Sequence, residues 1–247
     1  MAVCCIAALS LAGCVNSGKD HTLDADATAA TQWAVGEEVV EGNRQCFLLE
    51  GWGTCEMYRK FLGVTRDGYY LVQDFYAQDD VKLTDPYLLL HKEEVSVADF
   101  SPFALQVEGR YVEWHTNGHK WYEGQFADGK VTGVWSLWHG NGEKAAQGSL
   151  EGDNEQGVWT YWYENGQKSS EGAFVNGEQV GLWTQWYENG KKKAETHFVE
   201  GKVHGLWTEW HDNGMKKAEG LFDMDKPVGV WREWDDASKL LREENRG

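Results

Sequence analysis

The chain has 247 residues, and its 23 Lys and Arg against 40 Asp and Glu give a formal net charge of −17. This acidity disfavours a nucleic-acid partner, because binding to a phosphate backbone depends on a high density of cations. With 41% hydrophobic and 26% charged residues the composition is that of a soluble globular protein, in which 14 Trp and 29 Gly are unusually many.

The beginning of the chain has the pattern of a targeting signal. Residues 2–13 are apolar or small throughout, too few to span a bilayer as a helix but as many as a secretory signal core contains. They end in Leu11-Ala12-Gly13-Cys14, which resembles the lipobox of bacterial lipoprotein signal peptides. The resemblance implies a signal peptide over residues 1–13 and a lipid on the Cys14 thiol. The alternative is a buried N-terminal strand or helix.

The same resemblance predicts the location of the mature protein. Val15, rather than Asp, follows the cysteine. In a Gram-negative envelope this is similar to lipoproteins destined for the outer membrane, facing the periplasm. Residues 14–32 continue with small, polar and acidic residues that lack an apolar period, which predicts a lipidated cysteine followed by a flexible tether.

Two cysteines remain for the folded part of the chain, Cys46 and Cys55. An even pair outside the cytoplasm predicts a disulfide, and the alternative is two buried free thiols. Residues 33–108, which contain both, have apolar runs such as Tyr87-Leu88-Leu89-Leu90 between polar stretches. We expect short strands and turns there that form a β-rich N-terminal cap. This cap could consist of decayed copies of the repeat that follows it in the chain.

A period of 24 residues runs through residues 109–247. Two aromatic series, an Asn-Gly pair and single glycines recur at this spacing, and a period of this size indicates a repeat architecture. The sixth copy has Ala237-Ser238 in place of Asn-Gly, so we expect its turn to be lost and its charged end to form a degenerate, polar cap. The first series comprises Tyr111, Trp135, Trp159, Trp183, Trp207 and Trp231, and the second comprises Trp114, Trp138, Trp162, Trp186, Trp210 and Trp234.

Each copy has the pattern of one β-hairpin. In the fourth, a Trp-rich strand over residues 182–187 precedes Asn189-Gly190, which predicts a two-residue type I′ turn. A second strand runs from about residue 191 to 198, and residues 200–205 form a loop to the next copy.

Counting outward from the predicted turn gives the register. It places Trp138 opposite Ala145, and it places most of the first Trp series opposite glycines that the indoles would cover. In the fourth copy Trp183 faces Thr196 instead, so we expect looser packing there. Alternation puts the two Trp series on opposite faces of the sheet, one packed and one partly exposed. The predicted pairs are Trp135 with Gly148, Trp159 with Gly172, and Trp207 with Gly220.

The motif resembles the bacterial variant of the MORN repeat, in the form G-x-W-x-x-W-Y-x-N-G-x-K of YwqK-like antitoxin proteins. It stands here as residues 157–168, Gly-Val-Trp-Thr-Tyr-Trp-Tyr-Glu-Asn-Gly-Gln-Lys. The resemblance covers about residues 109–234 and implies an all-β fold, an elongated stack of antiparallel β-hairpins.

No pattern of catalytic or metal-binding residues stands out, and we predict neither an enzyme nor a cofactor or metal site. His115, His139 and His211 share a position with Tyr163 and Tyr187, which indicates packing rather than a ligand set. We interpret the Lys that follows each turn, such as Lys168, as a solvent-exposed residue beside the turn. The alternative is a cationic ladder for an anionic polymer.

Two hypotheses of function remain. The first is an exported, lipid-anchored protein-binding module, antitoxin- or immunity-like by resemblance, whose partner is a basic toxin. The second is a structural envelope spacer or scaffold without a dedicated partner. The candidate protein-binding residues are the Trp of the second series, since aromatic residues concentrate binding energy at interfaces: Trp138, Trp162, Trp186 and Trp210.

Overall fold

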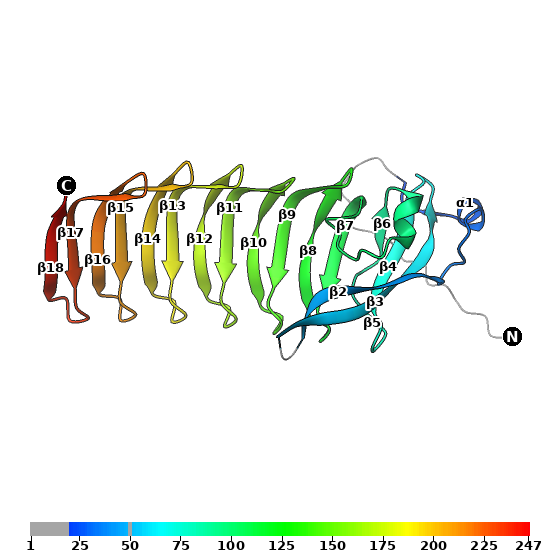
Figure 1. The fold of residues 1–247 in the computed structure, drawn as a ribbon, viewed down its shortest axis with the longest axis horizontal. Coiled ribbons are helices and arrows are strands. Elements are labelled where there is room, and N and C mark those ends of the chain that lie inside the picture. The colour runs from blue at the N-terminus through cyan, green and yellow to red at the C-terminus, as the bar shows by residue number, and fades with distance from the viewer. Residues whose placement is uncertain (1–19, 49–50) are drawn as a thin grey trace. The chain divides into compact units, whose positions relative to one another are not determined.

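The computed structural model describes residues 20–48 and 51–247, with backbone alone for residues 45–48 and 51–53. In these residues the regular structure is β-strand, apart from the helix α1 (Ala25–Ala29) and the 3-10 helix η1 (Lys92–Ser96), and the paired strands are antiparallel (Figure 1). The predicted all-β class with stacked antiparallel hairpins is confirmed.

The chain forms two compact units. The first comprises residues up to 111 together with 126–129, and the second comprises 112–125 and 130–247. In the first unit β3 pairs with β1 and β2 on one side and with β4 on the other, and β6 pairs with β4 and β7. Its strands are β1 (Leu23–Asp24), β2 (Glu38–Leu48), β3 (Gly51–Thr65), β4 (Tyr70–Tyr76), β5 (Val81–Lys82), β6 (Tyr87–Leu89) and the start of β7 (Val107–Trp114).

The sequence predicted short strands in the first unit, but two of its strands are long. β2 and β3 have 11 and 15 residues and form one ladder from the pair Glu38–Lys60 to the pair Leu48–Gly51. Backbone hydrogen bonds maintain such a ribbon even where the side chains lack an apolar period. The core of this unit lies beside the ladder, with Met57, Leu83 and Phe100 nearly inaccessible to solvent.

The predicted tether has regular structure in its described part. Leu23 pairs with Thr65 in β3, and Asp24 caps α1 by accepting a hydrogen bond from the Ala27 N–H at 2.9 Å. The hydroxyl of Thr28 accepts another from the Val64 N–H at 2.8 Å. Small polar residues therefore attach this segment to β3 through capping and side-chain hydrogen bonds, which a search for apolar periods does not detect.

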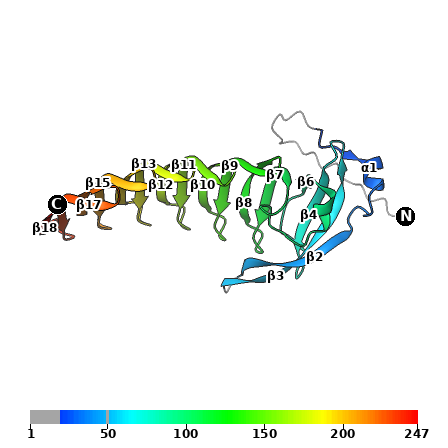
Figure 2. The ribbon, with the colours of Figure 1, turned by 45° about the horizontal axis from the view of Figure 1, so that its top comes forward.

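In the second unit each strand from β9 onward pairs with the next along the chain, so the hairpins lie side by side (Figures 1 and 2). The strands are β8 (Lys120–Ala127), β9 (Lys130–Trp138), β10 (Lys144–Glu151), β11 (Asn154–Trp162), β12 (Lys168–Val175), β13 (Glu178–Trp186), β14 (Lys192–Val199), β15 (Lys202–Trp210), β16 (Lys216–Asp223), β17 (Lys226–Trp234) and β18 (Leu240–Arg246).

The Asn-Gly turns are not of the predicted type I′. The N–H of Gly190 donates to the Tyr187 carbonyl at 2.9 Å, and the N–H of Tyr187 donates to the Lys191 carbonyl at 2.8 Å. Within this three-residue loop only Gly190 has a positive φ, 79°. The loop is therefore a type I turn completed by a left-handed Gly, a common three-residue hairpin connection.

A bulge after each such turn restores the predicted register. Trp186 pairs with Lys192 but Gln185 pairs with Ala194, so Lys193 is the extra residue. The same bulge makes Trp138 face Lys144 rather than Ala145, which corrects that prediction. Beyond the bulge the predicted pairs are confirmed: Trp135 with Gly148, Trp159 with Gly172, Trp183 with Thr196 and Trp207 with Gly220.

Type I′ geometry occurs at the opposite ends of most hairpins; the turn between β10 and β11 has a positive φ only at Gly152. β14 and β15 are joined by only Glu200 and Gly201, with φ of 50° and 73°, so the predicted loop over residues 200–205 is wrong. Gly205 lies within β15, with φ 89°. The glycine was a misleading signal because it serves a distorted strand rather than a loop.

The last hairpin keeps its turn, contrary to the prediction. The Ser238 N–H donates to the Asp235 carbonyl and the Asp235 N–H donates to the Lys239 carbonyl, both at 3.0 Å. Ser238 takes the left-handed place of Gly, with φ 65°. The Asp235 carboxylate accepts from the Lys239 N–H at 2.8 Å, which stabilises the loop without Asn-Gly.

Candidate functional site

The first Trp series lies on one face of the second unit, which we call the aromatic face. Trp135, Trp159, Trp183 and Trp231 are 2%, 6%, 6% and 7% exposed. Phenylalanines of the neighbouring strands meet these indoles edge-on: the ring centroids of Phe174 and Trp183 are 4.9 Å apart at 83°. Edge-to-face contacts of this kind add stability beyond the area that the rings bury.

Glycines make room for the buried indoles. The register predicted that each indole covers a glycine of its own hairpin, but the covered glycine belongs to the preceding hairpin. A Cβ on Gly148 would overlap the indole of Trp159, which belongs to the following hairpin. The same holds for Gly124 with Trp135, for Gly172 with Trp183 and for Gly220 with Trp231. Each indole therefore covers the glycine of the preceding copy. The looser packing predicted for Trp183 is therefore wrong, because Trp183 covers Gly172 and is buried. Thr196 occupies the glycine position in front of Trp207 instead, and it is Trp207, in the next copy, that is only half-buried.

The second Trp series lies on the opposite face and is half-buried, as Trp138, Trp162, Trp186 and Trp210 all are. The Lys that follows each turn places its ammonium over these rings, with Lys120 Nζ 4.6 Å from the ring centre of Trp138. Corresponding distances in the next three copies are 5.8, 5.9 and 5.9 Å. Lysine stems thus cover part of each predicted binding residue, a cation–π arrangement that also leaves part of each ring accessible.

These lysines are paired within the protein. Lys168 Nζ lies 2.6 Å from the Glu171 carboxylate and Lys216 Nζ lies 2.7 Å from that of Glu219. The hydrogen bonds from these lysines lower the pKa of Glu171 and of Glu219. Lys120 and Lys192 pair with Glu123 and Glu195 in the same way, whereas Lys144 donates to the neutral amide of Gln147. Because carboxylates neutralise most of the row, the arrangement favours the structural interpretation of the lysines over a cationic ladder for an anionic polymer.

A row of exposed aliphatic side chains shares this face, which we call the aliphatic face. The side chains precede the first Trp series by one residue, so alternation places them on the same side as the second series. Sequence reasoning missed the row, although a Val or Leu between Gly and Trp in five copies was a signal for it. The aliphatic row comprises Val134, Val158, Leu182, Leu206 and Val230, which are 57%, 63%, 46%, 51% and 41% exposed.

The position shared by Tyr and His has a definite role. Tyr187 donates its hydroxyl to the carbonyl of Trp210 at 2.7 Å, and His139 Nε2 lies 2.8 Å from the carbonyl of Trp162. Either side chain offers one donor to the next copy, which explains why the two interchange. The predicted packing position is thus a hydrogen-bonding position as well, and the Nε2 atom of each of these histidines contacts a Trp carbonyl of the next copy.

The first unit contains a buried ion pair that sequence reasoning also missed. Arg59 and Asp74 are both inaccessible, and two nitrogens of Arg59 contact the carboxylate at 2.6 and 3.0 Å. Tyr87 donates its hydroxyl to the same carboxylate at 2.8 Å. Burial opposes the Arg59 charge, but Tyr87 and Asp74 together raise its pKa above the usual value. The remaining guanidinium N–H groups meet backbone carbonyls, so the cluster reads as a structural anchor.

The cysteine predictions fall largely outside what the structure describes. Residues 1–19, with the predicted signal peptide and Cys14, are outside the described residues. Cys55 is disulfide-bonded, while only the backbone of Cys46 is described. In the β2–β3 hairpin Cys46 pairs with Gly53 and Cys55 with Arg44, so the two cysteines lie on neighbouring strands. The Cys46–Cys55 bond stays a prediction.

Over 20–48 and 51–247 there is no group of three or more His, Cys, Asp or Glu side chains arranged to hold a metal ion. Within that same span no helix has both the length and the apolar character needed to cross a membrane.

Comparison with known proteins supports the repeat assignment. The family described as "MORN repeat variant" matches three consecutive segments, residues 155–176, 179–200 and 203–224. Each segment covers the second strand of one hairpin and the tight turn after it, together with the preceding Trp-rich strand. A search of curated proteins found no match to the chain. These residues are thus repeats of the MORN variant type, an all-β module that typically has no catalytic role.

Proposed function

We propose that this chain is a protein-binding repeat module whose partner docks on the aliphatic face. The observation that carries the proposal is the aliphatic row, five Val or Leu side chains that are each at least 41% exposed. Exposed apolar side chains that recur along one face of a soluble domain commonly mark an interaction site. The half-buried second Trp series beside the row supplies aromatic contact area.

Charge suggests the chemistry of the partner. The chain carries a net charge of −17, which attracts a basic protein and accelerates its association. Together with the resemblance to YwqK-like antitoxin proteins, this supports an antitoxin- or immunity-like role against a basic toxin.

We further propose that the protein is exported and lipid-anchored in the cell envelope, on the outer membrane if the cell is Gram-negative. Support comes from the lipobox-like residues 11–14 and from Cys46 and Cys55 as an even pair. Metabolic labelling with palmitate tests the anchor: label lost in Cys14→Ser and kept in the wild type supports it. Unlabelled wild-type protein contradicts it.

The binding proposal is tested on the row itself. The double variant Leu182→Thr, Leu206→Thr removes apolar area and introduces β-branched side chains, which favour strands. The matched control Leu240→Thr, Leu241→Thr removes a similar exposed apolar area from β18. Each protein is used to capture partners from the envelope and culture medium of the native cell, and Trp186→Ala tests the second Trp series in the same way.

We expect one stoichiometric basic partner, toxic when expressed alone, to bind the wild type and the control. Binding should weaken at least tenfold in the aliphatic-row variant, which corresponds to about 1.4 kcal/mol. Equal binding by all variants would exclude the aliphatic face. Recovery of abundant envelope proteins only, at substoichiometric levels, would instead favour the structural spacer.

A further inference from the structure

The aromatic face contains a groove of about 320 Å³ over β13 to β16, yellow to orange in Figure 1. Its volume is at the lower end of the range for small-ligand pockets, about 300–1,000 Å³. Aromatic walls and polar side chains alternate around it. The walls are Phe198, Trp207 and Phe222, and the polar side chains include Gln185, Thr196 and Glu209.

The groove lies where the repeat pattern fails. In the neighbouring copies a glycine allows the next indole to lie flat on the sheet, and a Cβ at that glycine would overlap the indole. Thr196 has such a Cβ, so Trp207 cannot take the same place. The strand pairing differs too: Thr196 pairs directly with Trp207, whereas the register skips Gly172 in β12 and Gly220 in β16.

Trp207 is displaced along the sheet as a result. Its ring stacks on that of Trp231, with centroids 5.6 Å apart at 29°. The indole N–H groups of Trp159 and Trp183 donate to backbone carbonyls at 3.1 and 3.2 Å. In the part of the chain that the structure describes, the Trp207 N–H has no such acceptor. Phe222 also meets the Trp207 ring edge-on, with centroids 6.4 Å apart, but the half-buried ring still lines the groove. Part of an indole ring and an indole donor are thus both left for a ligand.

The charged side chains at the rim are already engaged. Glu209 forms an ion pair with Lys217 at 2.8 Å, and the ammonium of Lys193 lies 5.7 Å from the ring centre of Tyr187. Among the described residues that line it, the groove therefore has no unpaired charge that would favour an ionic ligand. What remains is part of an indole ring, with the indole N–H, the Thr196 hydroxyl and the Gln185 amide as donors and acceptors.

We infer that this groove binds a neutral sugar ring. A pyranose has an apolar C–H face that can lie on an indole and hydroxyl groups at its edge that match a rim of amide, hydroxyl and N–H groups. A wholly apolar side chain would fit less well, because it would remove Thr196 and Gln185 from water without offering them hydrogen bonds. The groove and the aliphatic face lie on opposite sides of the sheet, so the sugar site stands apart from the proposed protein-binding site.

The test follows the indole N–H signals of the purified protein by two-dimensional NMR, with the Trp207 signal assigned from its loss in Trp207→Phe. The probes are methyl glucoside, methyl mannoside, N-acetylglucosamine and the disaccharide cellobiose. They are added to about 50 mM, because one shallow site gives dissociation constants on the order of 1 mM. We expect saturable movement of the Trp207 signal with at least one sugar.

Three variants separate the groove from the general stability of the fold. Thr196→Gly removes the obstructing Cβ, so the Trp207 indole should lie flat on the sheet. Its NMR signal should then move toward those of Trp183 and Trp231, and the affinity for sugar should fall more than tenfold. Thr196→Ala keeps the Cβ, so it should keep the groove and the wild-type position of the Trp207 signal, while loss of the hydroxyl should weaken sugar binding less than Thr196→Gly does. Gly172→Thr introduces the same obstruction one copy earlier and should make the Trp183 signal respond to sugar.

Several results would overturn the inference. One is the absence of a saturable response to any of the sugars, and another is equal sugar binding by Thr196→Gly and the wild type. A Trp207 signal that stays unmoved in Thr196→Gly would refute the structural origin of the groove. Saturable binding of N-acetyl-phenylalanine amide or N-acetyl-leucine amide without binding of sugars would assign the groove to a protein side chain instead.

Discussion

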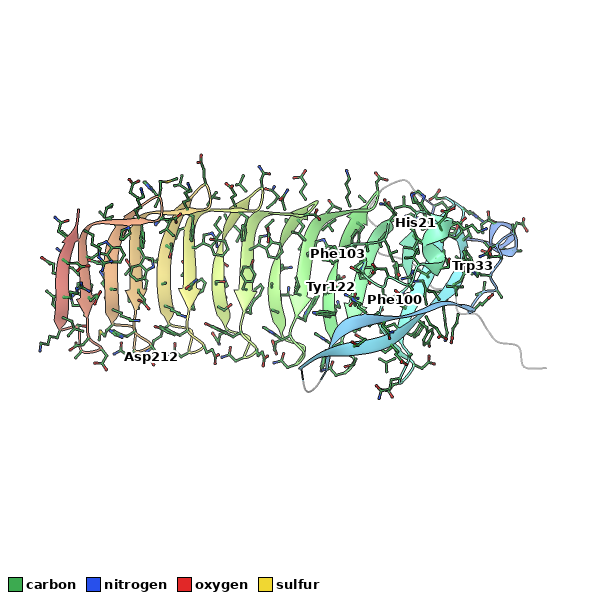
Figure 3. All side chains as sticks on the ribbon, viewed as in Figure 1. His21, Trp33, Phe100, Phe103, Tyr122 and Asp212 are labelled. Carbon is green, nitrogen blue, oxygen red and sulfur yellow. The ribbon has the colours of Figure 1, made fainter. Side chains whose placement is uncertain are left out.

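A single asparagine in each copy serves two hairpins at once. The Asn189 carbonyl oxygen accepts from the Lys191 N–H within its own turn, and its amide donates to the Asp212 carbonyl of the next turn, both at 2.9 Å. Asp212, labelled in Figure 3, lies at the Asn-Gly ends of the hairpins. Equivalent bonds link Asn117, Asn141, Asn165 and Asn213 to the following turn. Asparagine is therefore required for its side chain rather than for a positive φ.

Replacing this residue should destabilise the repeat array measurably. Asn189→Ala removes both hydrogen bonds, and we expect the free energy of unfolding to fall by about 1–2 kcal/mol. The measurement is urea unfolding followed by far-ultraviolet circular dichroism. Glu188→Ala, in the same exposed loop, is the control and should change stability little. Equal loss in both variants would mean that the loop itself, not the bridge, determines the effect.

A histidine at the Tyr/His position makes stability depend on pH. Burial is the main cause that lowers the pKa of His115, with the nearby His119 acting in the same direction. The unfolded chain therefore binds this proton at higher pH than the folded chain does. Stability should decrease as the pH falls through the ordinary His value of 6.5 toward the lower folded value.

The matched variant is His115→Tyr, because Tyr supplies the same donor in other copies and does not titrate in this range. We expect the wild type to lose more stability than His115→Tyr between about pH 7.5 and pH 5.5, as measured by urea midpoints. Parallel pH dependence in the two proteins would show that other groups dominate.

Pairs of neighbouring strands, rather than isolated hairpins, are the packing units of the aromatic face. Each buried indole lies on the glycine of the strand before it, so packing joins every copy to the previous one. The Asn-Gly and tight turns join the same copies at both ends: the Gly201 N–H, for example, donates to the Gln179 carbonyl at 3.1 Å. A copy therefore depends on its neighbours, as expected of repeat proteins.

Filling one glycine cradle should be costly. Gly172→Ala places a methyl group where the Trp183 indole lies, and we expect a loss of about 1–3 kcal/mol from overpacking. Gly140→Ala is the control, since a Cβ there meets no atom within 4 Å and the residue has no positive φ. Thermal or urea unfolding compares the two. Similar stability of both variants would contradict the close packing of indole on glycine.

At the scale of the whole molecule, the regular repeat predicts that the protein still folds when one 24-residue copy is removed. Deletion of residues 155–178 joins Asn154 to Gln179 in register and brings Trp183 over Gly148. We expect a folded, all-β protein whose unfolding midpoint is lower and whose m-value falls with the surface lost. The measurement is denaturant unfolding, and loss of cooperative unfolding would contradict the modular description.

The same deletion separates the two functional hypotheses. A binding module should lose affinity for its partner, because the deletion shortens the aliphatic row by Val158. A structural spacer should keep its function in the cell. The two results are distinguishable because folding is measured independently on the same protein.

The sequence alone determined the 24-residue period, the hairpin in each copy and the facing of Trp on Gly, because strict repetition carries the register with it. Residues 33–108 were less predictable, since the β2–β3 ribbon is held by backbone pairing that leaves no apolar period in the sequence, and the Arg59–Asp74 pair joins two strands whose register the sequence does not reveal.

Tertiary structure alone decided which face is buried, which glycine each indole covers and which turn is left-handed at two residues. These features depend on the neighbouring copy, and the pairing of residues within one hairpin carries no information about it. The displaced Trp207 is the clearest case. The sequence shows that Thr196 replaces the usual glycine, but only the pairing of β14 with β15 shows that the displaced indole is Trp207.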